Sequence, residues 1–257
     1  MNFGSYCKTV VLLASILGLL IFPACAAAQE THPAHWAYSG PDDPKHWAKL
    51  DPAYSACALG HTESPINIAH AQRADLPALK PEYEPTPLNI IDNGHTIQVN
   101  LAPGSALAVG DKAYTLTQLH FHHPSEEHVN GKSFPLVAHL VHQDSEGHLM
   151  VVAVLFHEGP PNPLIETLWK NIPTEKEKAQ DVPSVSIQVL DLLPADRGYF
   201  TFAGSLTTPP CTEGVTWYVF KSYATVSAEQ MAVFAKLYPK NARPIQPTNG
   251  RKILQSN

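Results

Sequence analysis

Short apolar runs separated by turn residues make up most of this sequence, and they limit the fold more than any other feature. Each run has the length of a β-strand and is bounded by Gly, Pro, Asn or Asp. The 24 prolines and 14 glycines among the 257 residues leave little room for long helices. The runs predicted as strands are 88–91, 96–101, 116–122, 136–142, 149–156, 187–190, 199–202 and 215–220.

Two segments have helical patterns instead. Asn162 is a good N-cap with Pro163 at the first helical position, which predicts a helix over 163–171. The segment 227–237 opens with a Ser-x-x-Gln capping box and then repeats apolar residues at a spacing of three. Because there is no internal repeat and no long linker, we expect one sheet-dominated domain over 29–257.

The composition is that of an ordinary globular protein, with 44% hydrophobic and 16% charged residues. The formal net charge is -6, and there is no run of Lys or Arg that could neutralise a phosphate backbone. We therefore expect no nucleic-acid partner.

The first 28 residues differ from the rest of the chain and predict a secretory signal peptide. Residues 10–22 are almost wholly apolar, and small residues suited to cleavage follow them. A membrane-spanning helix is the alternative, but it needs about 20 apolar residues. We expect cleavage after Ala26 or Ala28, with lipidation at Cys25 as a minor alternative. The mature protein would then be periplasmic or extracellular, without stable membrane insertion.

Removal of this leader leaves two cysteines, Cys57 and Cys211. An even number of cysteines in an exported chain favours a disulfide over two buried free thiols. In the chain-entropy model, closing so long a loop contributes about 4 to 5 kcal/mol of stability.

Three histidines on two predicted strands are candidate metal ligands. His120 and His122 are two residues apart, so both imidazoles leave the same face of a strand. An antiparallel neighbour that carries His139 could bring a third imidazole opposite them. Three imidazoles with one open position are typical of catalytic zinc. The pair alone is weak support, because the chain has 14 histidines and exported His-rich proteins also sequester metals.

A second assignment uses the same pair. His120, His122 and Glu126 match the His-x-His-x-x-x-Glu pattern of cupins, whose β-barrels hold iron or manganese. Tyr114 stands where cupins place a glycine before the first histidine, and their second motif has no clear match downstream. These departures count against a cupin.

A sequence block at residues 204–217 decides between the three-histidine zinc site and the cupin site. Residues 204–210 read Gly-Ser-Leu-Thr-Thr-Pro-Pro, and residues 213–217 read Glu-Gly-Val-Thr-Trp. The chain resembles the α-class carbonic anhydrases in their bacterial secreted form, along essentially the whole mature sequence. The resemblance implies a mainly β (α+β) fold, with a twisted, largely antiparallel central sheet and short peripheral helices. The segments that carry it are 36–38, 64–68, 93–95, 118–122, 138–142, 205–217 and 241–247.

The resemblance also implies a reaction, the reversible hydration of carbon dioxide to bicarbonate and a proton. One zinc ion per chain, held by the three histidines, would supply a hydroxide that attacks carbon dioxide. Thr207 matches the threonine that orients this hydroxide, and Glu126 matches its carboxylate partner, with Glu127 as the adjacent competitor. His95 matches the proton shuttle, a role suited to a side chain with a pKa near 6.5.

The family holds its small uncharged substrate against an apolar wall. For each matching residue, plain core packing is the alternative interpretation. The residues that match this pocket are Val141, Val151, Leu206, Thr208, Val215 and Trp217.

The histidines differ in their expected support. Gln118 matches the residue that accepts the free N–H of His120. Many family members carry a glutamate two residues before the third histidine, but this chain has Val137, which cannot accept a hydrogen bond. We therefore expect His139 to be less firmly oriented, with zinc affinity lowered by about 10 to 100 fold.

A different class of function uses the same scaffold. In a non-catalytic, exported zinc-binding protein the remaining histidines could bind metal, and no substrate would be needed. The histidines in question are His123, His128, His142, His148 and His157. The sequence leaves a homodimer open.

Overall fold

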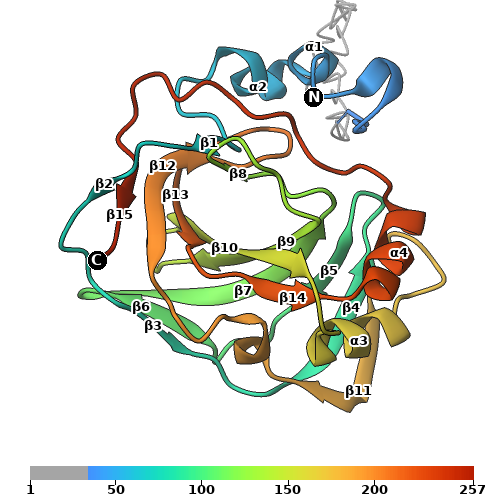
Figure 1. Cartoon of the computed structure of the whole chain (residues 1–257). Coiled ribbons are helices and arrows are strands. Elements are labelled where there is room, and N and C mark those ends of the chain that lie inside the picture. Colours follow the sequence, from blue (N-terminus) through green and yellow to red (C-terminus); the bar gives the residue numbers. More distant parts are fainter. Residues whose placement is uncertain (1–33) are drawn as a thin grey trace, which may run out of the picture. The chain divides into compact units, whose positions relative to one another are not determined.

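The computed structural model describes residues 34–257, and these form a body built around one large sheet (Figure 1). The predicted signal peptide and its cleavage sites lie outside the described residues. The large sheet has 13 strands, and a separate two-stranded sheet pairs β1 (Asn67–Ile68) with β8 (His128–Val129). None of the helices within residues 34–257 is long and apolar enough to cross a bilayer.

Five adjacent strands form the centre of the sheet and carry most of the candidate residues. In spatial order they are β5 (Ile97–Asn100), β7 (Lys112–His122), β9 (Leu136–Gln143), β10 (Leu149–Glu158) and β13 (Glu213–Phe220). The first four are antiparallel neighbours, whereas β10 and β13 run parallel. The expected largely antiparallel sheet is confirmed, with this parallel pair at its centre.

The remaining strands extend the sheet at both edges. On one side β4 (Thr86–Asp92) and β11 (Gln180–Ile187) follow β5. On the other side β12 (Tyr199–Ser205), β15 (Leu254–Gln255) and β2 (Gln72–Arg73) follow β13. Beside this path, β14 (Ala224–Val226) pairs with β10, and β6 (Ala106–Val109) pairs with both β3 (Leu79–Glu82) and β7.

The helices are short and lie at the periphery (Figure 1). Two of them, α3 and α4, are the predicted ones, and their ends lie within one residue of the prediction. The α-helices are α1 (Trp47–Leu50), α2 (Ala56–Leu59), α3 (Pro163–Lys170) and α4 (Ala228–Leu237), and the 3-10 helices are η1 (Gly40–Asp42), η2 (Pro52–Tyr54) and η3 (Val189–Leu192).

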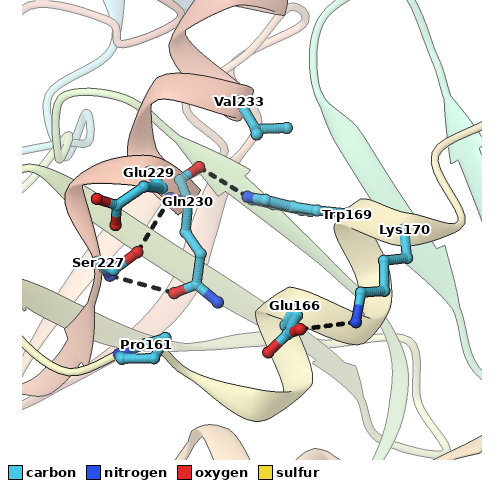
Figure 2. A pocket seen from close by; sticks show the side chains of 8 residues that line it. All are labelled: Pro161, Glu166, Trp169, Lys170, Ser227, Glu229, Gln230 and Val233. Atoms are coloured by element: carbon cyan, nitrogen blue, oxygen red, sulfur yellow. Dashed lines mark hydrogen bonds and ion pairs between the residues drawn. The ribbon is translucent and has the colours of Figure 1, made fainter.

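The predicted caps of α3 and α4 are present and are joined to each other. The Asn162 side chain accepts hydrogen bonds from the first turn of α3, and Ser227 forms a complete capping box with Gln230. The Gln230 side chain also bonds to Asn162 through both its oxygen and its nitrogen, at 2.9 and 2.8 Å. Trp169 Nε1 donates to the Gln230 carbonyl at 2.9 Å, across a groove of about 370 Å³ (Figure 2). The hydrogen bonds of Asn162, Trp169 and Gln230 therefore join the two helices.

One predicted strand is wrong. The run 187–190 ends β11 at Ile187 and then turns into η3. The Gln188 side chain explains the change, because its oxygen accepts a hydrogen bond from Leu190 N at 3.2 Å and so caps the 3-10 turn.

The alternation of side chains along the central strands builds a core on each face of the sheet. Val152 and Val154 of β10 join the cluster that packs against α3 and α4. Val151 and Ala153 join the opposite cluster, which includes Trp217. The second cluster lies on the same face as His139, so an apolar wall adjoins the candidate ligands.

The predicted disulfide is present. Cys57 of α2 and Cys211, which follows β12, have Cα atoms 5.1 Å apart and close a loop across 154 positions. Both cysteines pack with Trp47 and Tyr54 in a third apolar cluster. The bond thus ties the N-terminal helices to the loop that carries Thr207.

Candidate metal centre

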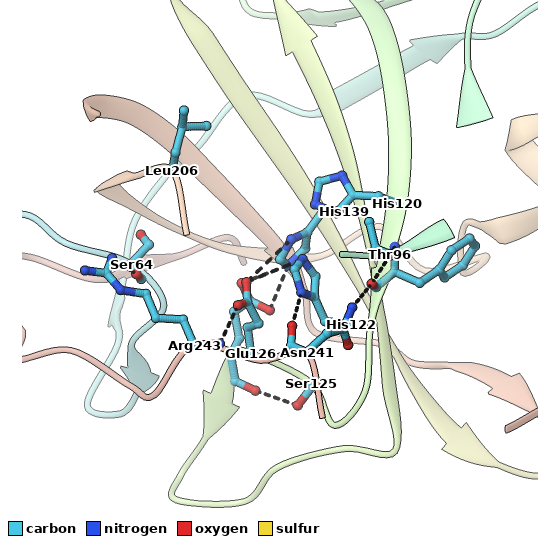
Figure 3. A network of polar contacts seen from close by, with 12 residues as sticks. Ser64, Thr96, His120, His122, Ser125, Glu126, His139, Leu206, Asn241 and Arg243 are labelled. Atoms are coloured by element: carbon cyan, nitrogen blue, oxygen red, sulfur yellow. Dashed lines mark hydrogen bonds and ion pairs between the residues drawn. The ribbon is translucent and has the colours of Figure 1, made fainter. Parts of the chain in front are cut away.

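The register of β7 and β9 brings the three predicted histidines together. His120 lies directly opposite His139, and His122 follows on the same face of β7. The three rings converge in Figure 3, with one ligand nitrogen from each within 4.8 Å of the others. Within residues 34–257 this is the one group of three or more such side chains placed to share a metal ion. The strand alternation used in the prediction explains this arrangement.

Hydrogen bonds on the outer ring nitrogens fix which atoms face inward. His120 Nδ1 donates to Gln118 Oε1 at 2.8 Å, as predicted for this glutamine. His122 Nδ1 donates to the Asn241 carbonyl at 2.7 Å. The Nε2 atom of each ring therefore carries a free electron pair instead of a hydrogen, and among residues 34–257 His122 Nε2 is buried without a hydrogen-bond partner. An orphaned buried nitrogen beside two further imidazoles fits a metal ion, and three imidazoles fit zinc in particular.

His139 has a carboxylate partner, so the expectation of a poorly supported third histidine is wrong. Its Nε2 lies 3.1 and 3.2 Å from the two carboxylate oxygens of Glu127. Val137 is indeed apolar and fully buried, but the acceptor comes from a different segment. The consecutive glutamates Glu126 and Glu127 were the only sequence feature that could have predicted this acceptor. The sequence alone did not indicate that the two carboxylates lie near different nitrogens of His139.

Glu126 lies on the opposite side of the same histidine. Its Oε2 is 3.6 Å from His122 Nε2 and 3.9 Å from His139 Nδ1, the nitrogens that face the centre. Its Oε1 accepts a hydrogen bond from Arg243 N at 2.8 Å. Burial raises the pKa of Glu126 to about 7, and the Thr207 hydroxyl is among the groups that oppose the rise. Thr207 therefore lies close enough to Glu126 to affect the pKa of its carboxyl group.

The protonation of the histidines follows their surroundings. Burial lowers the pKa of His120 to about 3 and holds that of His122 well below its usual value. Burial also lowers the pKa of His139, but the carboxylates of Glu127 and Glu126 outweigh it, so the net shift is upward. Two neutral imidazoles are thus ready to bind a cation without first losing a proton.

The predicted apolar wall adjoins the histidines. In the sheet Val151 lies beside Val141 on one side and Trp217 on the other. Val215 belongs to the same cluster, and Leu206 packs against it. The Trp217 ring meets the His139 ring edge to face, with centroids 4.9 Å apart. The sixth predicted pocket residue, Thr208, is half-buried in the loop after Thr207.

His95 lies farther out, in the turn between β4 and β5. Asn93 holds this turn, because its side-chain oxygen accepts a hydrogen bond from His95 N at 3.0 Å. The His95 ring is half-buried and stacks on Trp36, with centroids 3.7 Å apart and planes 7° from parallel. Burial lowers the pKa of His95, and the neighbouring His35 adds to the effect.

The additional histidines do not gather into a second centre within the described residues. His123 donates to the Pro135 carbonyl, and His148 pairs with Asp144 on the surface. His142 is fully buried, 2.7 Å from the Tyr83 hydroxyl, on the opposite face of β9 from His139. Their separation gives no support to a multi-histidine metal store.

Comparison with known proteins agrees with this geometry. Residues 42–257 match the family described as eukaryotic-type carbonic anhydrase. The chain belongs to this carbonic anhydrase family. A carbonic anhydrase of Pectobacterium carotovorum is 45% identical over 237 residues, which cover 91% of this chain and 96% of the relative. The prediction of a carbonic anhydrase enzyme is confirmed.

Solved structures of the family share the fold. The α-carbonic anhydrase of Thermovibrio ammonificans, in complex with the inhibitor sulfanilamide, superposes with a TM-score of 0.82 at 42% identity. The match covers 86% of this chain and 99% of that one. Dioscorin DB3L of Dioscorea polystachya is also similar, at 33% identity over 83% of this chain and 82% of the relative.

Two site residues, Asn241 and Arg243, lie in the segment 241–247, which carries the family resemblance but has no sequence pattern that predicts their contacts. Asn241 supplies the carbonyl that binds His122, and its side chain contacts the backbone of both His95 and His123. Arg243 is buried and joins Glu126 to Glu63. Their distance in sequence from the histidines left no local pattern that could reveal these contacts.

Proposed function

We propose that this carbonic anhydrase binds one zinc ion through His120, His122 and His139 and catalyses the reversible hydration of carbon dioxide to bicarbonate and a proton. The observation that carries the proposal is the buried His122 Nε2, which has no hydrogen-bond partner in the described part of the chain and lies beside two further inward-facing imidazole nitrogens. Zinc held there would supply a Lewis acid that lowers the pKa of water to about 7.

Thr207 and Glu126 would orient the attacking group. A carboxylate that accepts the Thr207 hydrogen leaves the threonine oxygen free to accept a hydrogen bond itself. The Arg243 amide supports this arrangement, because it binds the other oxygen of Glu126 at 2.8 Å and limits rotation of the carboxylate. Fixed hydrogen bonds of this kind lower the cost of reorganisation during the reaction.

The apolar wall would hold carbon dioxide beside the reacting group. The substrate carries no charge, so it suits an apolar surface, which binds water weakly, better than a polar one. Val141, Val215 and Trp217 are buried and belong to one cluster, which adjoins His139 through the Trp217 ring. Leu206 and Thr208 would complete the pocket from the loop around Thr207.

His95 would export the proton that each turnover releases. Its ring is half-buried at the edge of the site, and a lowered pKa keeps it neutral and ready to accept a proton near pH 7. Stacking on Trp36 holds the ring in one orientation in the structure. A histidine placed between solvent and site, with an ordinary pKa of about 6.5, is suited to this transfer.

The proposal extends to the cell compartment. We infer that residues 1–28 are a secretory signal peptide, that residues 29–257 form the catalytic domain, and that the enzyme works in the periplasm or outside the cell. The Cys57–Cys211 disulfide supports this, because such bonds persist in oxidising compartments.

Stopped-flow measurement of carbon dioxide hydration tests the proposal. The protein without its leader is assayed as purified, after treatment with a chelator, and after return of zinc. We expect hydration to disappear with the metal and to return with one zinc per chain. A zinc-loaded sample without hydration activity would overturn the proposed function.

A further inference from the structure

Glu127 is a buried carboxylate that the steps above do not use. Its side chain is 0% exposed, and both of its oxygens lie within 3.2 Å of His139 Nε2. Among the described residues His139 is the one hydrogen-bond partner of this carboxylate. A buried carboxylate is costly unless it is paired, so its position requires a compensating interaction, and the imidazole N–H supplies it.

The strand that carries His139 cannot provide this support. Val137 lies two residues before His139 on the same face of β9, opposite His122 on one side and Leu155 on the other. It is fully buried in the apolar cluster. Its branched hydrocarbon side chain has no acceptor atom.

The segment that carries Glu127 is held firmly against the sheet. Ser125 Oγ donates to the Glu127 carbonyl at 2.8 Å and accepts from Phe134 N at 2.9 Å. The next residue, His128, begins β8, and its backbone N–H donates to the Ile66 carbonyl at 3.2 Å. These hydrogen bonds, at the Glu127 carbonyl and at the next backbone N–H, fix the position of the Glu127 backbone. A fixed backbone is needed for its side chain to form a hydrogen bond of well-defined geometry.

We propose that Glu127 is the positioning residue for His139 and replaces, from the loop before β8, the carboxylate that position 137 of β9 lacks. By accepting the Nε2 hydrogen it selects the tautomer in which Nδ1 is free. Glu126 Oε2 lies 3.9 Å from that Nδ1, so the carboxylates of the two consecutive glutamates lie near opposite nitrogens of the His139 ring. The inference rests on the proposed function, since it assigns the third zinc ligand.

Three variants test it: Glu127→Ala, Glu127→Gln, and Glu127→Ala combined with Val137→Glu. Zinc affinity is measured by competition with a chromogenic chelator, and ligand geometry by the visible spectrum of the cobalt-substituted protein. We expect Glu127→Ala to weaken zinc binding by about 10 to 100 fold and to alter the cobalt spectrum. Glu127→Gln keeps an acceptor and should lose less. The double variant should recover affinity, because it returns a carboxylate to the strand.

Glu166→Ala is the control, since Glu166 is exposed on α3 and, among residues 34–257, its carboxylate pairs only with Lys170. Thermal unfolding of each metal-free variant separates loss of the fold from loss of the ligand; if Glu127→Ala does not fold, the near-isosteric Glu127→Gln carries the test. Wild-type affinity in the Glu127 variants would overturn the inference while leaving the proposed function intact. A wild-type protein that binds no zinc would instead contradict the proposed function.

Discussion

Asn241 holds His122 through its backbone and the surrounding turns through its side chain. Its carbonyl accepts from His122 Nδ1 at 2.7 Å, and its amide nitrogen donates to the His95 carbonyl at 3.0 Å. The amide oxygen accepts from His123 N at 2.8 Å. One residue of the C-terminal segment thus connects a candidate ligand to the turn that carries His95.

Asn241→Ala should destabilise the protein more than it weakens zinc binding. The substitution keeps the carbonyl that orients His122 but removes the buried side-chain bonds to His95 and His123. Unsatisfied buried groups cost about 1 to 3 kcal/mol, so the free energy of unfolding in urea should fall by that amount. Loss of zinc without loss of stability would contradict this division of roles.

Thr207→Val should impair catalysis and leave the metal in place. The valine keeps the shape of the side chain but cannot bond to Glu126 or accept from a reacting group. We expect kcat/KM for hydration to fall by about two to three orders of magnitude, as when one oriented donor is removed from an active site. Zinc content should stay at one per chain, and Thr207→Ser should retain most of the activity. Equal activity in the valine variant would exclude an orienting role for this hydroxyl.

His95→Ala should slow proton export specifically. Because proton transfer follows hydration, kcat should fall in dilute buffer while kcat/KM stays near the wild-type value. Added imidazole buffer should restore kcat by carrying the proton directly. A parallel fall in both constants, insensitive to buffer, would show that His95 acts on the substrate step instead.

His142 should make the protein less stable in acid. Burial lowers its pKa to about 3, and the ring is held between the Leu140 carbonyl and the Tyr83 hydroxyl. The unfolded chain, with a histidine pKa of about 6.5, binds the proton first, so the free energy of unfolding falls by about 1.4 kcal/mol per pH unit below that value.

The comparison that isolates this effect is between wild type and His142→Asn, both metal-free. Unfolding in urea is followed from pH 7.5 to pH 4.5. The variant should be less stable at pH 7.5, because Tyr83 loses its partner, yet its stability should decline less steeply toward acid. Parallel profiles would show that His142 does not contribute to the acid sensitivity.

Much of the site follows from strand geometry, and this part was predictable. The two-residue spacing of His120 and His122 and the position of His139 on the next strand require only alternation and antiparallel pairing. The contacts of Glu127 and Asn241 were not predictable in this way. They depend on how a loop and a distant segment pack against the sheet, and no periodicity records that. The apolar Val137 correctly signalled a missing carboxylate, but not that a neighbour of Glu126 would replace it.

Anomalous diffraction at the zinc absorption edge, from crystals of the protein without its leader, tests the metal centre most directly. We expect one peak per chain, about 2.0 to 2.1 Å from His120 Nε2, His122 Nε2 and His139 Nδ1, with Glu127 on the far nitrogen of His139. A peak at another site, bonding through His139 Nε2, or no zinc in a protein that hydrates carbon dioxide would contradict the three-histidine centre.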